Sequence, residues 1–208
     1  MKKNIIAFLF LLTLFHLGNA QTYKFGAFAN LHKSSIVGIH DFSRGKLGGG
    51  VGVFANIGLV ENDVWDSAWL YLDPQIEFSM QGENADARAG WQTFDHWYVA
   101  SQVYLKYFFH KGNLKRDIFI FAGPRIEYLV RQERKGPPSP PVFEEQEQRI
   151  NKFGYGVSFG TGLKISQQLE GTIRYDWGFG KVYPDYTRYH TYNRLLSLGI
   201  NYYFTSNW

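Results

Sequence analysis

The segment Ser197-Leu-Gly-Ile-Asn-Tyr-Tyr-Phe204, close to the C-terminus, shows the pattern that decides the fold. Apolar and aromatic residues occupy every second position from Leu196 to Phe204, whereas Ser197, Gly199, Asn201 and Tyr203 occupy the positions between them. Successive side chains of a β-strand point to opposite faces. One face of this strand therefore suits lipid, and the other suits a polar interior.

The same alternation recurs along the whole chain. Eight segments have period two, their charged residues fall on one face, and each reaches the roughly 9 to 11 residues with which a tilted strand crosses a membrane. The predicted strands are 23–31, 47–58, 68–80, 96–109, 117–130, 152–165, 169–179 and 196–204. We therefore predict an all-β fold: an eight-stranded antiparallel up-and-down transmembrane β-barrel.

The composition fits a barrel that is apolar outside and polar inside. The chain of 208 residues has 18% aromatic residues and 22 glycines, and its mean hydropathy is −0.28. Glycines dominate one face of the second and sixth predicted strands, where a narrow interior needs small residues. The absence of cysteine excludes disulfides and thiolate metal sites. The net charge is +4 and the charged residues are scattered along the chain, so the sequence gives little support to nucleic-acid binding.

The N-terminus resembles an export signal. Lys2 and Lys3 precede an apolar run over residues 5–15, and Gly18-Asn19-Ala20 supplies small residues before a cleavage point. The run is too short to span a bilayer as a helix, and no later run approaches the roughly 20 apolar residues that this requires. We predict a cleavable signal peptide at 1–20 and one outer-membrane β-barrel domain at 21–208.

The lengths of the connections predict an orientation. Outer-membrane barrels have short periplasmic turns and longer outside loops. The long connections are 32–46, 81–95, 131–151 and 180–194, and the short ones are 59–67, 110–116 and 166–168. Both ends of the mature chain are therefore expected on the periplasmic side. Aromatic belts are expected at the periplasmic rim (Tyr107, Phe109, Tyr202, Phe204 and Trp208) and at the outer rim (Trp97, Tyr128, Tyr155, Trp177 and Phe179).

Two prolines fall inside predicted strands. Pro74 and Pro124 cannot donate a hydrogen bond to a neighbouring strand. We expect a bulge or a kink at each of them.

Several motifs resemble a known family. They are Leu72-Asp-Pro-Gln-Ile-Glu-Phe-Ser79, Tyr104-Leu-Lys-Tyr-Phe-Phe109, Phe121-Ala-Gly-Pro-Arg125, Gly154-Tyr-Gly-Val-Ser-Phe-Gly-Thr-Gly162, Arg174-Tyr-Asp-Trp-Gly178 and the terminal strand. In this order they resemble the PorT-like outer-membrane β-barrel family common in Bacteroidetes. The resemblance implies a barrel in the outer membrane of a Gram-negative cell; PorT proteins themselves help to assemble a protein-secretion machine.

The terminal strand also resembles the signal by which barrel-assembly machinery recognises outer-membrane proteins. Ser197, Gly199, Tyr202 and Phe204 are the positions that carry this resemblance. It implies that the assembly machinery is a partner during insertion and that outer-membrane lipids surround the finished barrel.

Charges of both signs fall on the inward face. They are Glu77, Lys106, Arg125, Glu127, Lys164, Glu170, Arg174 and Asp176. Two interpretations are open: a gate whose ion pairs exchange partners to pass ions, or a plug in which a narrow interior pairs each buried charge. We favour the plug, because the interior of a small barrel is filled by side chains.

An enzyme is the other open class. His32 and Ser34 have the spacing of lipid A deacylases, but they fall at the start of the first predicted loop and no third group to orient a base is identifiable. We expect no catalytic residue, metal or cofactor. The leading hypothesis is a barrel with a structural, adhesive or accessory role. This role could be associated with secretion and could involve an unidentified protein partner at the surface. The alternatives are a lipid-modifying enzyme and a small-solute pore.

Overall fold

The computed structural model describes residues 22–37, 43–62, 65–87, 90–110, 116–136, 150–184 and 191–204, and the structural statements below refer to these ranges. The strands are β1 (Tyr23–Val37), β2 (Ser43–Asn62), β3 (Trp65–Ala87), β4 (Gly90–Phe108), β5 (Ile118–Lys135), β6 (Phe153–Lys164), β7 (Leu169–Lys181) and β8 (Tyr192–Tyr203).

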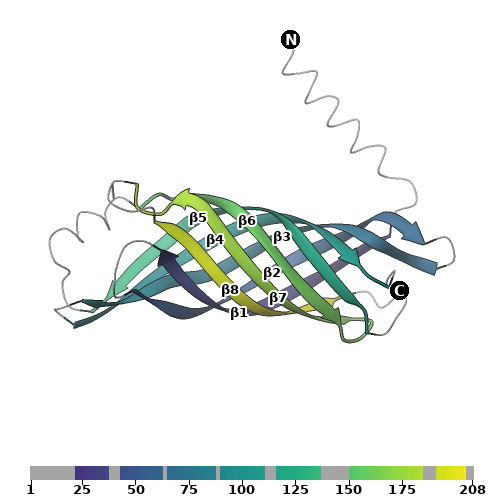
Figure 1. Cartoon of the computed structure of the whole chain (residues 1–208), viewed down its shortest axis with the longest axis horizontal. Coiled ribbons are helices and arrows are strands. Elements are labelled where there is room, and N and C mark those ends of the chain that lie inside the picture. The colour runs from purple at the N-terminus through teal and green to yellow at the C-terminus, as the bar shows by residue number, and fades with distance from the viewer. Residues whose placement is uncertain are drawn as a thin grey trace, which may run out of the picture.

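Each strand pairs antiparallel with the next, and β8 pairs with β1, so the sheet closes into a barrel (Figure 1). The predicted eight-stranded antiparallel barrel is confirmed. In the described ranges no helix is long and apolar enough to cross a membrane. We call the end that holds Tyr23 and Tyr203 the proximal end and the opposite end the distal end. The predicted signal peptide and Trp208 lie outside the described residues.

The strands extend further than the alternation predicts, mainly at the distal end. The predicted loop 81–95 is wrong, since β3 and β4 stay paired as far as Ala87 and Gly90. In the same way, β1 continues to Val37 and β5 continues to Lys135. Backbone hydrogen bonding continues beyond the apolar band. The side chains there are mostly polar, so the alternation of apolar and polar residues that predicts a strand is lost.

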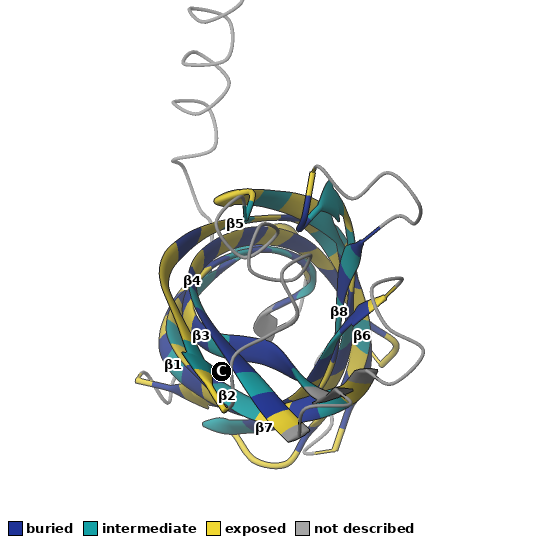
Figure 2. Ribbon diagram, turned by 90° about the vertical axis from the view of Figure 1, so that its left-hand side faces the viewer, coloured by how far each residue is buried: buried dark blue, intermediate teal, exposed yellow. Residues whose placement is uncertain are grey.

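The two faces of the barrel differ as the parity predicts. Outward side chains such as Leu31 and Leu47 are 74% and 78% exposed, whereas inward ones such as Glu77 are fully buried (Figure 2). The remaining exposed apolar side chains run along all eight strands and form the surface that lipid covers. Tyr107, Phe109, Tyr202, Phe204, Tyr128, Tyr155, Trp177 and Phe179 are exposed on this face, and Trp97 is partly covered.

Inward aromatic rings fill the interior where neighbouring strands carry glycine. A Cβ atom on Gly52 would lie 2.5 Å from Cζ of Phe28, and one on Gly160 would lie 2.4 Å from Cζ of Phe121. Both rings are buried. The inward glycines therefore make room for aromatic rings, which narrow the lumen.

The prolines do not produce bulges. The β3–β4 register runs through Pro74 unchanged, and the β5–β6 register runs through Pro124 unchanged. On the opposite edge of each strand, a few residue pairs are missing next to the proline. The β2–β3 ladder lacks pairs between Gln75 and Leu72, and the β4–β5 ladder lacks pairs between Arg125 and Ala122. Both ladders continue in the same register beyond the gap. The expected bulge is therefore absent at both prolines. The missing N–H interrupts the hydrogen bonds on one side only.

Candidate functional site

Glu77 of β3 is the centre of a buried polar network inside the barrel. Arg174 of β7 donates from Nη2 to both carboxylate oxygens at 3.0 Å, and Arg125 of β5 donates from Nη1 to Oε2 at 2.7 Å. Asn30 and Gln102 donate to the same carboxylate at 2.8 and 3.1 Å. Two cations and two amides thus satisfy one carboxylate that is shielded from water.

The acids of β5 and β7 complete this central layer. Arg174 Nε lies 3.1 Å from Asp176 Oδ1, and Arg125 Nη1 lies 3.7 Å from Asp176 Oδ2. Arg125 also pairs through Nε with Glu127, at 3.3 Å. Each arginine is shared between carboxylates of different strands, so the layer links the walls of the barrel.

A second charged layer lies closer to the proximal end. Lys106 of β4 donates to Glu170 Oε2 at 2.6 Å and to the hydroxyl of Tyr203 at 3.0 Å. That hydroxyl donates to Glu170 Oε1 at 2.9 Å. Lys164 is buried directly opposite Glu170 in the β6–β7 register. All eight inward charges named from the sequence therefore lie on the inner face, divided between these two layers.

Neutral residues complete the network, and sequence reasoning did not single them out. Besides Asn30 and Gln102, Asn193 and Gln81 donate to Glu127, each at 3.2 Å, near the distal end. Asn30 and Gln102 have the inward parity of their predicted strands, which is the signal that could have identified them, whereas Gln81 and Asn193 lie in strand extensions that were predicted as loops. Their partners follow only from the closure of the barrel.

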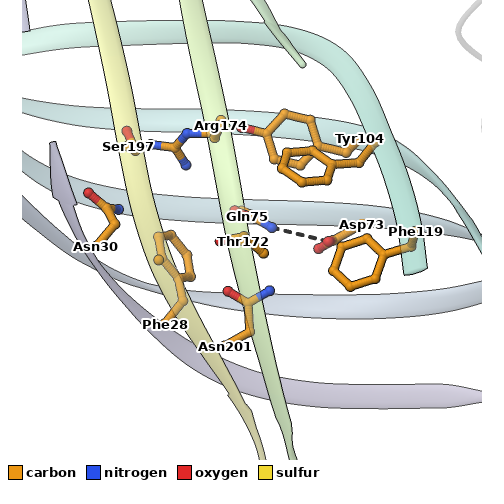
Figure 3. Close-up of a pocket in the computed structure, with 12 residues that line it drawn as sticks. Phe28, Asn30, Asp73, Gln75, Tyr104, Phe119, Thr172, Arg174, Ser197 and Asn201 are labelled. Carbon is orange, nitrogen blue, oxygen red and sulfur yellow. Dashed lines mark hydrogen bonds between the residues drawn. The ribbon is translucent and has the colours of Figure 1, made fainter. Parts of the chain in front are cut away.

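The open space between the two layers is small. A cavity of about 20 Å³ is bordered by Arg174 and Tyr104 on one side and by Phe28, Asp73 and Asn201 on another (Figure 3). Gln75 donates to Asp73 across its floor at 3.1 Å. This volume is close to what a single water needs.

His32 and Ser34 each contact β3 through separate hydrogen bonds. Both lie within β1 rather than in a loop, and both face inward. His32 contacts Asn30 Oδ1 through Nδ1 and the carbonyl oxygen of Met80 through Nε2, at 2.9 and 2.8 Å. Ser34 donates to the carbonyl of Gly82 at 2.7 Å and accepts from its N–H at 2.9 Å. These contacts fasten β1 to β3.

In the described parts of the chain, no three His, Asp or Glu side chains gather around one point, so these parts contain no candidate metal site.

The residues of the terminal signal divide between the two faces of β8. Ser197 is buried and Gly199 is half-buried on the inward face, whereas Tyr202 is exposed outward and Phe204, just beyond the strand, is exposed as well. The N–H of Phe204 donates to the carbonyl of Phe25 in β1 at 2.9 Å, so this end of the chain closes the barrel.

A closed barrel with an apolar outer face and a filled, charged interior defines the class of small outer-membrane β-barrels. Residues 19–183 match the outer membrane protein beta-barrel domain family, and the chain belongs to this family. The family resides in the outer membrane of Gram-negative cells. No curated protein matches the chain.

The chain is similar to several solved outer-membrane proteins at low sequence identity. Neisserial surface protein A is 14% identical, with a TM-score of 0.46 over 88% of this chain and 97% of that chain. Ail, the attachment invasion locus protein of Yersinia pestis, is 11% identical, with a TM-score of 0.45 over 88% and 98%. OprG of Pseudomonas aeruginosa is 9% identical, with a TM-score of 0.45 over 88% and 95%.

Proposed function

We propose that this protein is a closed, non-catalytic outer-membrane barrel with a structural, adhesive or accessory role at the cell surface. The observation that carries the proposal is the Glu77 carboxylate held between Arg125 and Arg174. The cavity next to this central layer, which aromatic rings also border, has space for about one water. A solute would have to separate buried ion pairs to pass, which costs several kcal/mol.

The distal end is the surface that this barrel offers to partners. In β3 and β4 the strands continue as a paired ladder beyond the lipid-facing band. We place both termini in the periplasm, because the two longest connections, 136–152 and 182–191, lie at the distal end. The hairpin that β3 and β4 form at the distal end then lies outside the cell. Its paired strands offer a continuous surface to a partner protein.

Within the outer-membrane family, we assign the chain to the PorT-like, Bacteroidetes-type branch. The motifs from Leu72–Ser79 to Arg174–Gly178 support this assignment. A secretion-associated accessory role is one form that the proposed function can take. Crosslinking in intact cells through a photoreactive residue at Asn84, followed by purification of the barrel, would identify the partner; crosslinks to lipid alone would contradict a protein-binding role for this hairpin.

Conductance in planar lipid bilayers tests the closed lumen. The wild-type protein is expected to give no discrete conductance steps. Regular steps from the wild type would favour the small-solute pore instead. The matched variant is Glu77→Ala/Arg174→Ala, which removes both side chains of one cross-lumen pair; steps seen only with this variant would locate the block at the central layer.

The absence of catalysis is tested separately. Mass spectrometry of lipid A from cells with and without the expressed protein is expected to show the same species. A new lipid A species that disappears in the His32→Ala variant would overturn this part of the proposal. Loss of the same species in an Asn201→Ala control, which removes an inward amide that donates to Glu170 near the proximal end, would indicate damage to the barrel rather than loss of a catalytic group.

A further inference from the structure

Two cations at the distal end lie on the outward face and take no part in the interior network. Arg194 of β8 stands opposite Trp177 of β7 in the register, and its guanidinium Cζ lies 5.2 Å from the centroid of the indole ring. Lys33 of β1 stands opposite Leu196, and Ser35 stands opposite Arg194. The Cα atoms of Lys33 and Arg194 are therefore diagonal neighbours on adjacent strands, roughly 7–8 Å apart. The side chain of Lys33 lies over Gly45 of β2, so it has to swing towards β8 to share a ligand with Arg194.

Neither cation has an acidic partner in the described parts of the chain. β1 and β8 contain no acid, and the two acids of β7, Glu170 and Asp176, are committed to the lumen. Nε of Arg194 is buried and has no hydrogen-bond partner among the described residues. The ring of Trp177 holds the guanidinium in place without neutralising it. The result is one positive charge held on Trp177 and a second, on the long stem of Lys33, on the neighbouring strand.

The pair stands at the level of lipid headgroups. Two residues from Lys33 on the same face, Leu31 is 74% exposed; two residues from Arg194, Leu196 is 53% exposed. Both leucines belong to the lipid-facing band. Trp177 is an aromatic residue of the kind that marks the membrane–water interface. The cations thus lie near the distal edge of the apolar band, among the aromatic residues of the rim.

We propose that Lys33 and Arg194 bind the phosphate of a lipid headgroup in the leaflet that surrounds the distal end. The planar guanidinium offers two parallel donors to phosphate oxygens, and the ammonium adds a point charge. A lipid is favoured over a soluble anion because the site continues into the lipid-facing band. Acyl chains lie along Leu31 and Leu196 while the phosphate meets the two cations.

Native mass spectrometry of the detergent-purified protein, titrated with diphosphoryl lipid A, tests the proposal. The variant is Lys33→Gln/Arg194→Gln. The control is Arg116→Gln/Lys152→Gln, which removes the same charge from exposed positions elsewhere. Wild type and control are expected to retain lipid A equally, and the variant is expected to lose about fivefold in affinity for each cation removed. Heat-modifiable gel migration establishes that all three proteins are folded.

Three outcomes would overturn the proposal. Equal retention by variant and control would show that the two cations are not a site. Undiminished retention of fully dephosphorylated lipid A by the wild type would show that phosphate is not recognised. Competition by millimolar inorganic phosphate would assign the cations to a soluble anion. A Trp177→Leu variant, which frees the guanidinium, is expected to reproduce part of the loss.

Discussion

Arg174 on β7 donates to both carboxylate oxygens of Glu77 on β3, at 3.0 Å each, although these strands stand four places apart in a ring of eight. The contact therefore crosses the full width of the barrel. Arg125 on β5 reaches the same carboxylate from a third wall. One carboxylate thus ties together strands that share no backbone hydrogen bonds.

This arrangement predicts a large loss of stability when Glu77 is changed. Glu77→Gln leaves two buried guanidinium groups with too few negative partners, so the free energy of unfolding is expected to fall by about 3–5 kcal/mol. Urea unfolding of the protein in lipid vesicles, followed by gel mobility, measures the change. Glu133→Gln removes an exposed acid that pairs with Arg131 and is expected to cost less than about 1 kcal/mol. Equal effects would mean that the central layer does not hold the barrel together.

The cross-lumen pair should also show energetic coupling. In a double-mutant cycle, Glu77→Gln/Arg174→Gln is expected to lose less stability than the sum of the two single changes, by about 0.5–3 kcal/mol, because the second change removes a charge that the first left unpaired. The same urea titration measures all four proteins. Strict additivity would show that each residue is stabilised mainly by its other partners.

In the layer near the proximal end, Lys106 and Tyr203 both contact Glu170, but their substitutions are expected to lower the free energy of unfolding by different amounts. Lys106→Met leaves the buried carboxylate without this cation and is expected to cost about 3–5 kcal/mol. Tyr203→Phe removes a single hydroxyl and is expected to cost about 1–3 kcal/mol. Unfolding in urea separates the two values. A larger loss for Tyr203→Phe would indicate that Lys164, opposite Glu170, can replace Lys106.

The inward glycines give a packing prediction with an internal control. Gly160→Ala places a methyl group 2.3 Å from the carbonyl oxygen of Ile173 and 2.4 Å from Phe121, so a destabilisation of about 1–3 kcal/mol is expected. Gly171→Ala meets nothing closer than 3.5 Å, at the side chain of Ile165, and is expected to be nearly neutral. If urea midpoints fall equally for both variants, the loss comes from the strand backbone and not from the interior.

Phe204 is expected to act during assembly rather than in the stability of the finished barrel. Phe204→Ala should lower the amount of folded protein recovered from membranes, because the terminal aromatic residue belongs to the predicted assembly signal. Leu198→Ala, at an equally exposed outward position (63% against 61%), is the control. Cellular yield is compared with refolding of the purified protein into detergent. A matching defect in refolding would assign the loss to stability and contradict the signal.

Sequence reasoning reached the strands but not all of their ends. The alternation around Phe78 and Leu198 places apolar residues outside and polar ones inside, and the structure has both on the outward face. The same reasoning failed at Pro74, where a bulge was expected. A closed sheet can omit hydrogen bonds on one side of a proline, since the surrounding pairs hold the register. It also missed the strand extensions to Val37, Ala87 and Lys135, where polar side chains carry no hydrophobic period.

The sequence by itself determined the class of fold and the inward position of the eight charged residues named from its alternation, because the period of a strand is a local property of the backbone. It could not determine that Glu77 meets Arg174 or that Arg194 rests on Trp177 beside Lys33. Those contacts depend on the register between strands and on the closure of eight strands into one ring. Only the tertiary structure therefore decided that the interior charges of opposite walls meet across the lumen, and that two cations remain outside at the edge of the lipid-facing band.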